Sequence, residues 1–258
     1  MDASARGLRV LLTAGAAGIG EAFAKAFADA GARIFICDVD AAALEAFRAR
    51  RPAIGATVTD VSDPRQVDRL FAEAEAFLGG LDVLINNAGI AGPTAPVEDI
   101  AIADWDRTIA VDLNGMFYCT RRAVPLLKAA GGGSIINLSS VAGRLGFPLR
   151  TPYSAAKWAV VGFTKSLAIE LGPSNIRVNA IQPGVVEGER IERVIAAKAK
   201  ALGLGHEEYR RQILSKVSLR RSVSPVDIAN MALFLATDAG RNVSGQALSV
   251  CGNVETLS

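Results

Sequence analysis

A tyrosine and a lysine stand one helical turn apart in the segment Tyr153-Ser154-Ala155-Ala156-Lys157. Because residues four positions apart lie on one face of an α-helix, their side chains face the same way. A phenol ordinarily keeps its proton until about pH 10, and an ammonium held beside it favours the ionised form. Such a tyrosine can exchange a proton with a substrate hydroxyl near neutral pH, which is the proton chemistry of alcohol oxidation and carbonyl reduction.

A hydroxyl that could hold a substrate oxygen lies upstream of this pair. Ser140 follows a short apolar run and precedes Tyr153 by thirteen residues. Its hydroxyl could donate to a substrate oxygen while the phenol handles the proton. Ser139 is the competing candidate, because spacing alone does not separate the two serines.

An asparagine interrupts a long predicted helix. Asn114 lies within the helical pattern of residues 103–130, and asparagine is a poor residue for a helix interior. It could distort the helix and leave a backbone carbonyl free to hold a water molecule, and Gly115 would ease that distortion. The alternative is a partly exposed polar residue without a chemical role.

A glycine-rich turn opens the chain at residues 13–20, with the sequence Thr-Ala-Gly-Ala-Ala-Gly-Ile-Gly. It follows a predicted strand and begins a predicted helix, which is the context that a dinucleotide-binding turn requires. Gly15, Gly18 and Gly20 allow the backbone to approach a pyrophosphate, and the helix start offers N–H groups and a positive dipole end to that anion. The alternative is a tight turn that binds nothing.

An acidic residue ends the second predicted strand. Asp38 could hydrogen-bond both ribose hydroxyls of an adenosine and would repel a 2′-phosphate. No arginine follows, because Val39 and Asp40 are the next residues, and this favours NAD over NADP. Asp38 could instead cap the next helix, although Asp40 is better placed for that.

Two further strand ends carry candidate cofactor contacts. Asp60, followed by Val61, could face the adenine amino group or cap the turn before Pro64, and the sequence leaves both open. The fourth predicted strand ends in Asn-Asn-Ala-Gly at residues 86–89. Small residues and amides there suit close approach to a cofactor and bracing of the sheet edge, while the alternative is an ordinary Asn-Gly turn.

The elements that must position these residues alternate along the chain. Strands are predicted at residues 8–13, 33–37, 53–59, 81–86, 134–139, 177–182 and 247–251. Helices are predicted at residues 18–30, 41–51, 64–78, 103–130, 152–171 and 225–237. Pro64 and Pro225 suit first-turn positions behind a Ser or Asp cap. The strands are almost continuously apolar, as in parallel strands covered on both faces. The alternation predicts an α/β fold, a doubly wound parallel sheet of the Rossmann type, in a single domain.

One stretch breaks this rhythm. Between Pro183-Gly184 and Pro225 the chain has no predicted strand, and residues 189–201 and 207–216 are charge-rich and compatible with helices. Open α/β sheets bind ligands at the carboxyl ends of their strands, where this insertion begins. We expect a helical substrate lid at about residues 187–220. The alternative is a solvated surface excursion.

The composition excludes several classes of protein. The 258 residues carry a formal net charge of +2, which gives no nucleic-acid footprint, and neither a signal peptide nor a membrane span is expected. Cys37, Cys119 and Cys251 form no CxxC motif, which indicates reduced thiols and a cytoplasmic location. The one histidine, His206, argues against Ser-His-Asp hydrolysis and most histidine-built metal sites, so no metal is expected.

These motifs, in this order, resemble the short-chain dehydrogenase/reductase family across essentially the whole chain. The resemblance implies Tyr153 as acid/base, Ser140 as donor to the substrate oxygen, and Lys157 as both phenol activator and nicotinamide-ribose ligand. It implies that Asn114 organises a water that relays protons from Lys157. It also implies that Val186 touches the nicotinamide carboxamide, and that the enzyme is a homo-oligomer, most often a tetramer, paired through the two long helices.

The cofactor-binding residues expected from the motifs and the resemblance together are Gly15, Ala17, Gly18, Ile19, Gly20, Asp38, Asp60, Val61, Asn87, Ala88, Gly89, Tyr153, Lys157, Pro183, Gly184 and Val186. Two positions depart from the family pattern. Ala14 stands where the glycine-rich turn ordinarily has its first glycine. Gly188 stands where a threonine often follows the Pro-Gly pair, so a hydroxyl bond to the carboxamide is not available.

The sequence therefore predicts an NAD(H)-dependent oxidoreductase that interconverts a secondary alcohol and a ketone, with a small-molecule substrate. An NADPH-dependent 3-ketoacyl reductase shares the catalytic residues, and Asp38 argues against it. A non-catalytic dinucleotide-sensing regulator on the same fold would not need the full set of catalytic residues. A sugar-nucleotide epimerase would need a larger C-terminal substrate region.

Four arginines could mark the substrate. Arg144 and Arg150 lie between Ser140 and Tyr153, and the insertion adds Arg190 and Arg193. Guanidinium groups suit a carboxylate, sulfonate or phosphate, which suggests a substrate with an apolar body and an anionic end. Solvated arginines or subunit contacts are the alternative, and they leave a neutral alcohol or polyol open.

Overall fold

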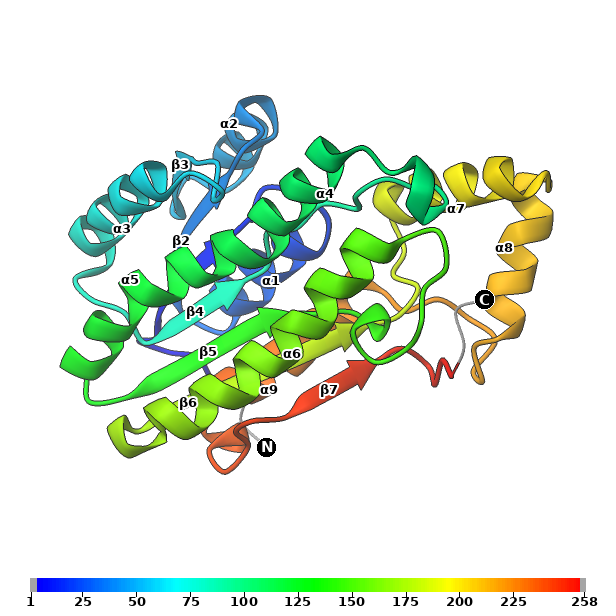
Figure 1. Ribbon diagram of the computed structural model, residues 1–258. Coiled ribbons are helices and arrows are strands. Elements are labelled where there is room, and N and C mark those ends of the chain that lie inside the picture. The colour runs from blue at the N-terminus through cyan, green and yellow to red at the C-terminus, as the bar shows by residue number, and fades with distance from the viewer. Residues whose placement is uncertain (1–3, 256–258) are drawn as a thin grey trace.

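Seven parallel strands form one central sheet in the computed structural model, which describes residues 4–255 (Figure 1). The strand order is β3-β2-β1-β4-β5-β6-β7. The strands are β1 Arg9–Thr13, β2 Arg33–Asp38, β3 Gly55–Val58, β4 Val83–Asn86, β5 Gly133–Leu138, β6 Ile176–Pro183 and β7 Ala247–Val250. The doubly wound α/β fold is confirmed, and each predicted strand is present with its ends within two residues of the prediction.

The helices follow the predicted alternation. They are α1 Gly18–Asp29, α2 Ala41–Arg50, α3 Pro64–Leu78, α4 Ile102–Ile109, α5 Gly115–Ala129, α6 Thr151–Leu171, α7 Glu189–Leu202, α8 His206–Ser215 and α9 Pro225–Ala236. Side chains of Asp40, Asp63 and Ser224 cap α2, α3 and α9 by accepting first-turn N–H groups. Such caps are each worth about 1 kcal/mol.

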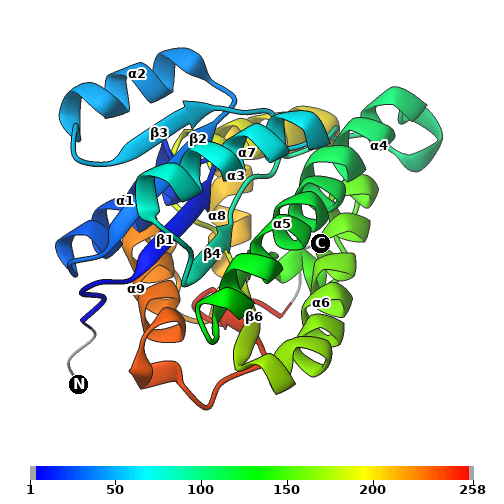
Figure 2. The same ribbon diagram turned by 90° about the vertical axis from the view of Figure 1, so that its left-hand side faces the viewer.

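Helices cover both faces of the sheet (Figure 2). Val10 and Leu12 of β1 pack into a core with α1, α2 and α9. Leu11, between them, packs into the opposite core with α3, α5 and α6. Successive side chains of a strand point to opposite faces, so burial on both faces explains why the strand sequences are almost continuously apolar.

The predicted single helix at residues 103–130 is wrong as one element. Its middle, Ala110–Asn114, is a π-helical turn that separates α4 from α5. A π turn inserts an extra residue and is often found at functional sites. Gly115 permits the close approach that follows, because a Cβ there would lie 2.7 Å from Cγ2 of Val61. The expected distortion near Asn114 is therefore present.

The α7–α8 segment lies beyond the carboxyl ends of the strands, to the right in Figure 1. The two helices pack together through Ile195, Ala199 and Tyr209, which are all buried. The segment thus has a small apolar core of its own, separate from the two cores that flank the sheet.

Two chain-wide expectations can be compared with the structure. Within residues 4–255, no helix has both the length and the apolar character needed to cross a bilayer. Cys37, Cys119 and Cys251 are buried and unpaired, as expected. Burial raises the pKa of the Cys37 thiol to about 12, so that residue behaves as a small apolar side chain.

Candidate active site

Tyr153 and Lys157 lie on the same face of the first turns of α6, as predicted. The Nζ atom of Lys157 is 5.5 Å from the centroid of the Tyr153 ring. Lys157 is buried, and its ammonium donates to the main-chain oxygen of Leu138, at the end of β5, over 3.0 Å. This hydrogen bond fixes the ammonium beside the phenol.

The structure separates the two candidate serines after β5. Ser139 Oγ donates to the main-chain oxygen of Lys157 over 2.8 Å, so its proton is already used. Ser140 caps the short 3₁₀ turn Val141–Gly143, and its Oγ accepts from the N–H of Ala142 over 3.1 Å. An accepting hydroxyl keeps its proton for another partner. Ser140 is therefore the serine that can donate to a substrate oxygen.

Asn114 does not lie beside these residues. The residue of the π turn that faces Lys157 is Asp112. The side chain of Asn114 is exposed, whereas Asp112, two residues earlier on the π turn, is buried. Asp112 Oδ1 accepts from the N–H of Ile90 over 2.7 Å, and Oδ2 lies 3.5 Å from Nζ of Lys157. The sequence signal that could have found it is a carboxylate between two apolar residues, Val111 and Leu113.

The glycine-rich turn has the features of an anion site. The first residue before α1, Ala17, provides no side-chain cap, so the first N–H groups of the helix have no side-chain partner. Gly18 has φ +57° with open space where a Cβ would stand. A Cβ on Gly20 would lie 1.9 Å from the oxygen of Ala14. This uncapped helix start fits the pyrophosphate of a dinucleotide.

Asp38 connects the end of β2 to that turn. Its Oδ2 accepts from the N–H of Ala16 over 3.1 Å, and its Oδ1 accepts from the N–H of Asp40 over 3.1 Å. The cap of α2 is Asp40, which accepts from the N–H of Ala43. The alternative role for Asp38 as that cap is thereby excluded.

Comparisons with known proteins agree with this geometry. Residues 14–253 match the family described as Enoyl-(Acyl carrier protein) reductase. The chain is 39% identical over 244 residues to galactitol 2-dehydrogenase of Agrobacterium fabrum (strain C58 / ATCC 33970), covering 94% of this chain and 95% of that protein. It is 37% identical over 245 residues to cis-4-hydroxycyclohexanecarboxylate dehydrogenase of Sinomonas cyclohexanicum, covering 94% of each.

Solved structures extend the likeness. A crystal structure of NAD+-bound xylitol dehydrogenase superimposes with a TM-score of 0.91 at 29% identity, covering 96% of this chain and 99% of that one. Levodione reductase superimposes with a TM-score of 0.90 at 30% identity, covering 96% and 97%. The chain belongs to the short-chain dehydrogenase/reductase family. It is an oxidoreductase of alcohol and ketone substrates that uses a nicotinamide dinucleotide.

In this short-chain dehydrogenase/reductase, Asp60 caps the turn before Pro64, whereas the cap of α3 itself is Asp63. Asp60 accepts from the N–H and hydroxyl of Ser62 over 2.9 and 2.6 Å, and it pairs with Arg107 over 3.1 Å. Burial raises the pKa of Asp60, but the hydrogen bonds from Ser62 and Arg107 outweigh burial and hold it below the ordinary value. Val61, beside it, is buried.

The turn after β4 braces the glycine-rich turn. Asn87 Nδ2 donates to the main-chain oxygens of Thr13 and Ala14 over 3.0 and 2.9 Å. The N–H of Ala88 donates to Oγ1 of Thr13 over 2.9 Å. A Cβ on Gly89 would lie 3.2 Å from the active-site ammonium. The bracing role expected of this segment is present, and no larger residue fits at Gly89 without displacing the lysine.

The segment after β6 turns towards the α7–α8 segment. A Cβ on Gly184, which follows Pro183, would lie 2.7 Å from the Cβ of Cys251. Val186 pairs with Val223 in an isolated parallel bridge. Gly188 has φ +131°, a conformation that side-chain-bearing residues rarely adopt. This explains the departure from the family, because a threonine would strain the backbone where α7 begins.

The four candidate arginines divide into two pairs. The guanidinium carbons of Arg150 and Arg190 lie 5.1 and 5.9 Å from the centroid of the Tyr153 ring. Arg144 instead bonds the main-chain oxygen of Val254 and pairs with Glu255. The side chain of Arg193 is exposed. Only the first pair lies beside the candidate catalytic tyrosine.

Proposed function

We propose that this enzyme is an NAD(H)-dependent oxidoreductase that interconverts a secondary alcohol and a ketone, with Tyr153 as the acid/base. The observation that carries the proposal is the buried ammonium of Lys157, which lies beside the Tyr153 ring and donates to the last main-chain oxygen of β5, just before Ser140 in the chain. The alternative of a non-catalytic regulator gives no reason for the buried ammonium beside the phenol or for the free proton of Ser140.

Each residue has a separate task in the reaction. Ser140 donates its hydroxyl proton to the substrate oxygen and orients it. Tyr153 takes the proton of the substrate hydroxyl in oxidation and returns it in reduction, and Lys157 places a positive charge beside it. The bound nicotinamide supplies or accepts the hydride. Lys157 would also hold the nicotinamide ribose, and Asp112 faces its ammonium over 3.5 Å.

Asp38 selects NAD. Its carboxylate, at the end of β2, accepts from the N–H of Ala16 in the glycine-rich turn, so it lies beside the place that fits the pyrophosphate. A 2′-phosphate placed there would meet a like charge, which is costly in a binding site. This argues against the NADPH-dependent 3-ketoacyl reductase, although a putative ketoacyl reductase of Streptomyces violaceoruber is 37% identical to this chain.

The α7–α8 segment acts as the substrate lid. Lys198 and Arg190 of α7 lie against the aromatic rings of Phe147 and Tyr153, so α7 covers the candidate catalytic tyrosine. A cavity of about 260 Å³ lies between α7, α8 and the chain after β6, and Gly188, Ile195 and Leu214 are among its lining residues. Ser140, Tyr153 and Lys157 do not line this cavity, which therefore lies beside the catalytic residues and not over them.

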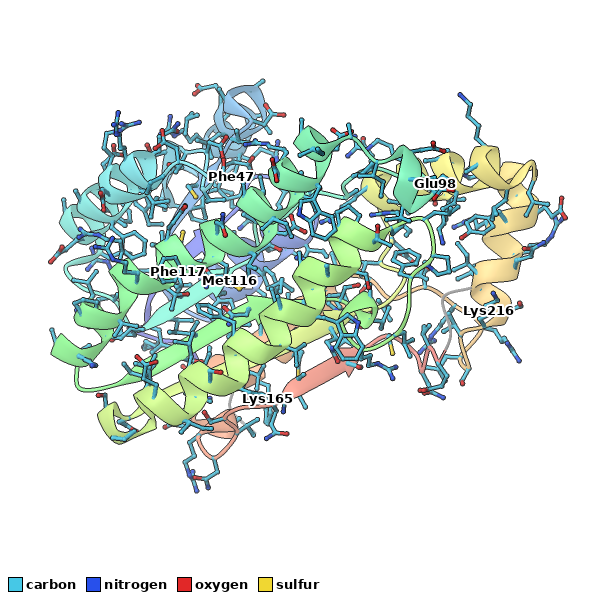
Figure 3. All side chains as sticks on the ribbon, in the orientation of Figure 1. Phe47, Glu98, Met116, Phe117, Lys165 and Lys216 are labelled. Carbon is cyan, nitrogen blue, oxygen red and sulfur yellow. The ribbon has the colours of Figure 1, made fainter. Side chains whose placement is uncertain are left out.

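The enzyme assembles as a homotetramer through α5 and α6, which lie side by side on one face (Figures 1 and 2). Phe117 of α5, labelled in Figure 3, is 48% exposed, and Trp158 and Ile169 of α6 are 51% and 82% exposed. Large apolar side chains exposed on neighbouring helices favour burial between subunits. Light scattering that gives the mass of one chain, 26.9 kDa, would contradict this assembly.

A substrate and cofactor survey tests the function. Purified enzyme is assayed with NAD and with NADP against polyols, cyclic alcohols, hydroxy acids and hydroxyacyl thioesters, while NADH formation is followed. The proposal expects turnover of at least one secondary alcohol with NAD. NADH binding without turnover of any substrate in either direction would instead support the regulator.

A further inference from the structure

The enzyme buries more positive than negative charge around Tyr153. Within residues 4–255 the buried charged side chains are Asp112, Arg150, Lys157 and Lys198. The single carboxylate already accepts from Ile90 and faces Lys157. Arg150 and Lys198 therefore have no buried carboxylate of their own. A buried charge without a partner is strongly destabilising, so this surplus needs a reason.

Arg150 is the clearest case. It immediately precedes α6 and is 2% exposed. One guanidinium nitrogen, Nη2, donates to the main-chain oxygen of Ala91. Its Nε and Nη1 atoms are buried without a hydrogen-bond partner among the described residues. Arginine stays charged at any working pH. Its Nε and Nη1 donors therefore have no acceptor among the described residues.

Lys198, on α7, adds a second cation next to Phe147. Its Nζ lies 4.2 Å from the centroid of the Phe147 ring, and the guanidinium carbon of Arg150 lies 5.3 Å from the same centroid. The Phe147 and Tyr153 rings are 6.5 Å apart in an edge-on arrangement. Arg190, on the same helix as Lys198, approaches the Tyr153 ring. Cations from the start of α6 and from α7 thus converge beside the candidate acid/base.

The phosphates of the cofactor do not account for this charge. The glycine-rich turn that fits a pyrophosphate follows β1, whereas Tyr153 and Ser140 lie beside the end of β5, two positions along the sheet from β1. Neighbouring strands are about 4.8 Å apart, which separates the two places by roughly 10 Å. The cations therefore face the substrate side of Tyr153.

We propose that Arg150 and Lys198, assisted by Arg190, bind a carboxylate of the substrate, so that the physiological pair is a hydroxy acid and its oxo acid. This inference rests on the proposed function, because it takes Tyr153 as the group that meets the carbinol. The Phe147 ring adds an apolar surface beside the cations and Tyr153, which suits a short hydrocarbon segment joining the two ends of the substrate. Because Lys198 and Arg190 lie on α7, the carboxylate also draws α7 down over the site.

Matched acids and esters test the subsite. The probes are 3-hydroxybutyrate, 4-hydroxycyclohexanecarboxylate and the methyl ester of each, assayed with NAD. Wild type is expected to favour the acids. Arg150→Met and Lys198→Met should each lower kcat/KM for the acids by between about 30-fold and several thousand-fold, the loss typical of truncating one partner of a buried charge pair. The esters should change by less than about threefold. Arg193→Met, an exposed position on α7, is the control and should leave both classes unchanged.

A binding measurement separates this inference from the proposed function. Calorimetry compares cyclohexanecarboxylate with cyclohexanecarboxamide, which have the same shape but differ in charge. The subsite predicts that only the carboxylate binds measurably, and that both methionine variants lose this binding. Equal binding of acid and amide, or equal turnover of acid and ester in all variants, overturns the subsite while Tyr153-dependent turnover would still uphold the proposed function. Carboxylate binding without any turnover would uphold the subsite and overturn the function.

Discussion

Lys157 and Asp112 face each other in the interior, with Nζ 3.5 Å from Oδ2 and both side chains shielded from solvent. The lysine comes from α6 and the aspartate from the π turn, so the pair joins two elements on the same face of the sheet. It also fixes the ammonium whose charge acts on Tyr153. Removing one partner of a buried ion pair typically costs about 3–5 kcal/mol, because the other charge is left without compensation.

Asp112→Ala should therefore lower the free energy of unfolding by about 3 kcal/mol or more. The change removes the carboxylate that faces the Lys157 ammonium and accepts from the N–H of Ile90. Asp112→Asn keeps an acceptor for that N–H and should cost less. Urea denaturation of both variants measures this difference. An unfolding free energy for Asp112→Ala within 1 kcal/mol of wild type would contradict this account of the pair.

Asp38 should make kcat/KM with NAD larger than with NADP by about 10²-fold or more, because like charges in an interface cost several kcal/mol. Asp38→Ser should reduce that preference by improving NADP use. Asp40→Ala is the matched control: it removes the cap of α2, which costs about 1 kcal/mol of stability, and should leave the cofactor preference intact. Equal use of the two cofactors by wild type would refute this role for Asp38.

Ala14 should be a strained position. Its φ is +51°, in the left-handed region where a side chain costs roughly 1–2 kcal/mol. Ala14→Gly relieves this strain but adds unfolded-state entropy, so a net stabilisation of at most about 1 kcal/mol is expected in thermal unfolding. Gly20→Ala should be strongly destabilising, because its Cβ would overlap the oxygen of Ala14. A lower Tm for Ala14→Gly would show that the turn does not need a glycine there.

Lys198 should make substrate binding pH-dependent. Burial, together with the nearby charges of Arg150 and Lys216, lowers the pKa of Lys198 to about 8. The ammonium is charged below that pH and neutral above it. The KM for a hydroxy acid should therefore be lowest below pH 8 and rise as the pH passes through about 8, while the KM for its ester stays flat. Lys198→Met should remove this rise. The same rise in KM for an ester would show that another group is titrating.

The sequence predicted the sheet, the order of its elements and the pairing of Tyr153 with Lys157, because these follow from short-range periodicity and helical spacing. It pointed to Asn114 and did not single out Asp112. An ordinary helix and a π turn place those two residues differently, and only the turn shows that Asp112 faces Lys157. Spacing likewise left Ser139 and Ser140 equal, and the hydrogen bond of Ser139 to the backbone decided between them.

The sequence pattern also could not predict contacts between residues that are far apart in the chain. Arg144 differs from Arg150 because its guanidinium contacts the C-terminal segment. It pairs with Glu255 and donates to the main-chain oxygen of Val254. The charge-rich pattern of residues 189–201 does not single out Lys198, which is one of the few buried charged side chains among the described residues. Burial of this kind arises only from packing of α7 against Phe147.

The most direct test of the central claim is Tyr153→Phe, measured for turnover and for NADH binding on the same preparation. The change removes only the transferable proton, so kcat should fall by about 10²–10⁴-fold, the typical contribution of a general acid/base. The dissociation constant for NADH, from fluorescence titration, should stay within about twofold of wild type. A Tyr153→Phe enzyme with near wild-type kcat would contradict the assignment of Tyr153 as the acid/base.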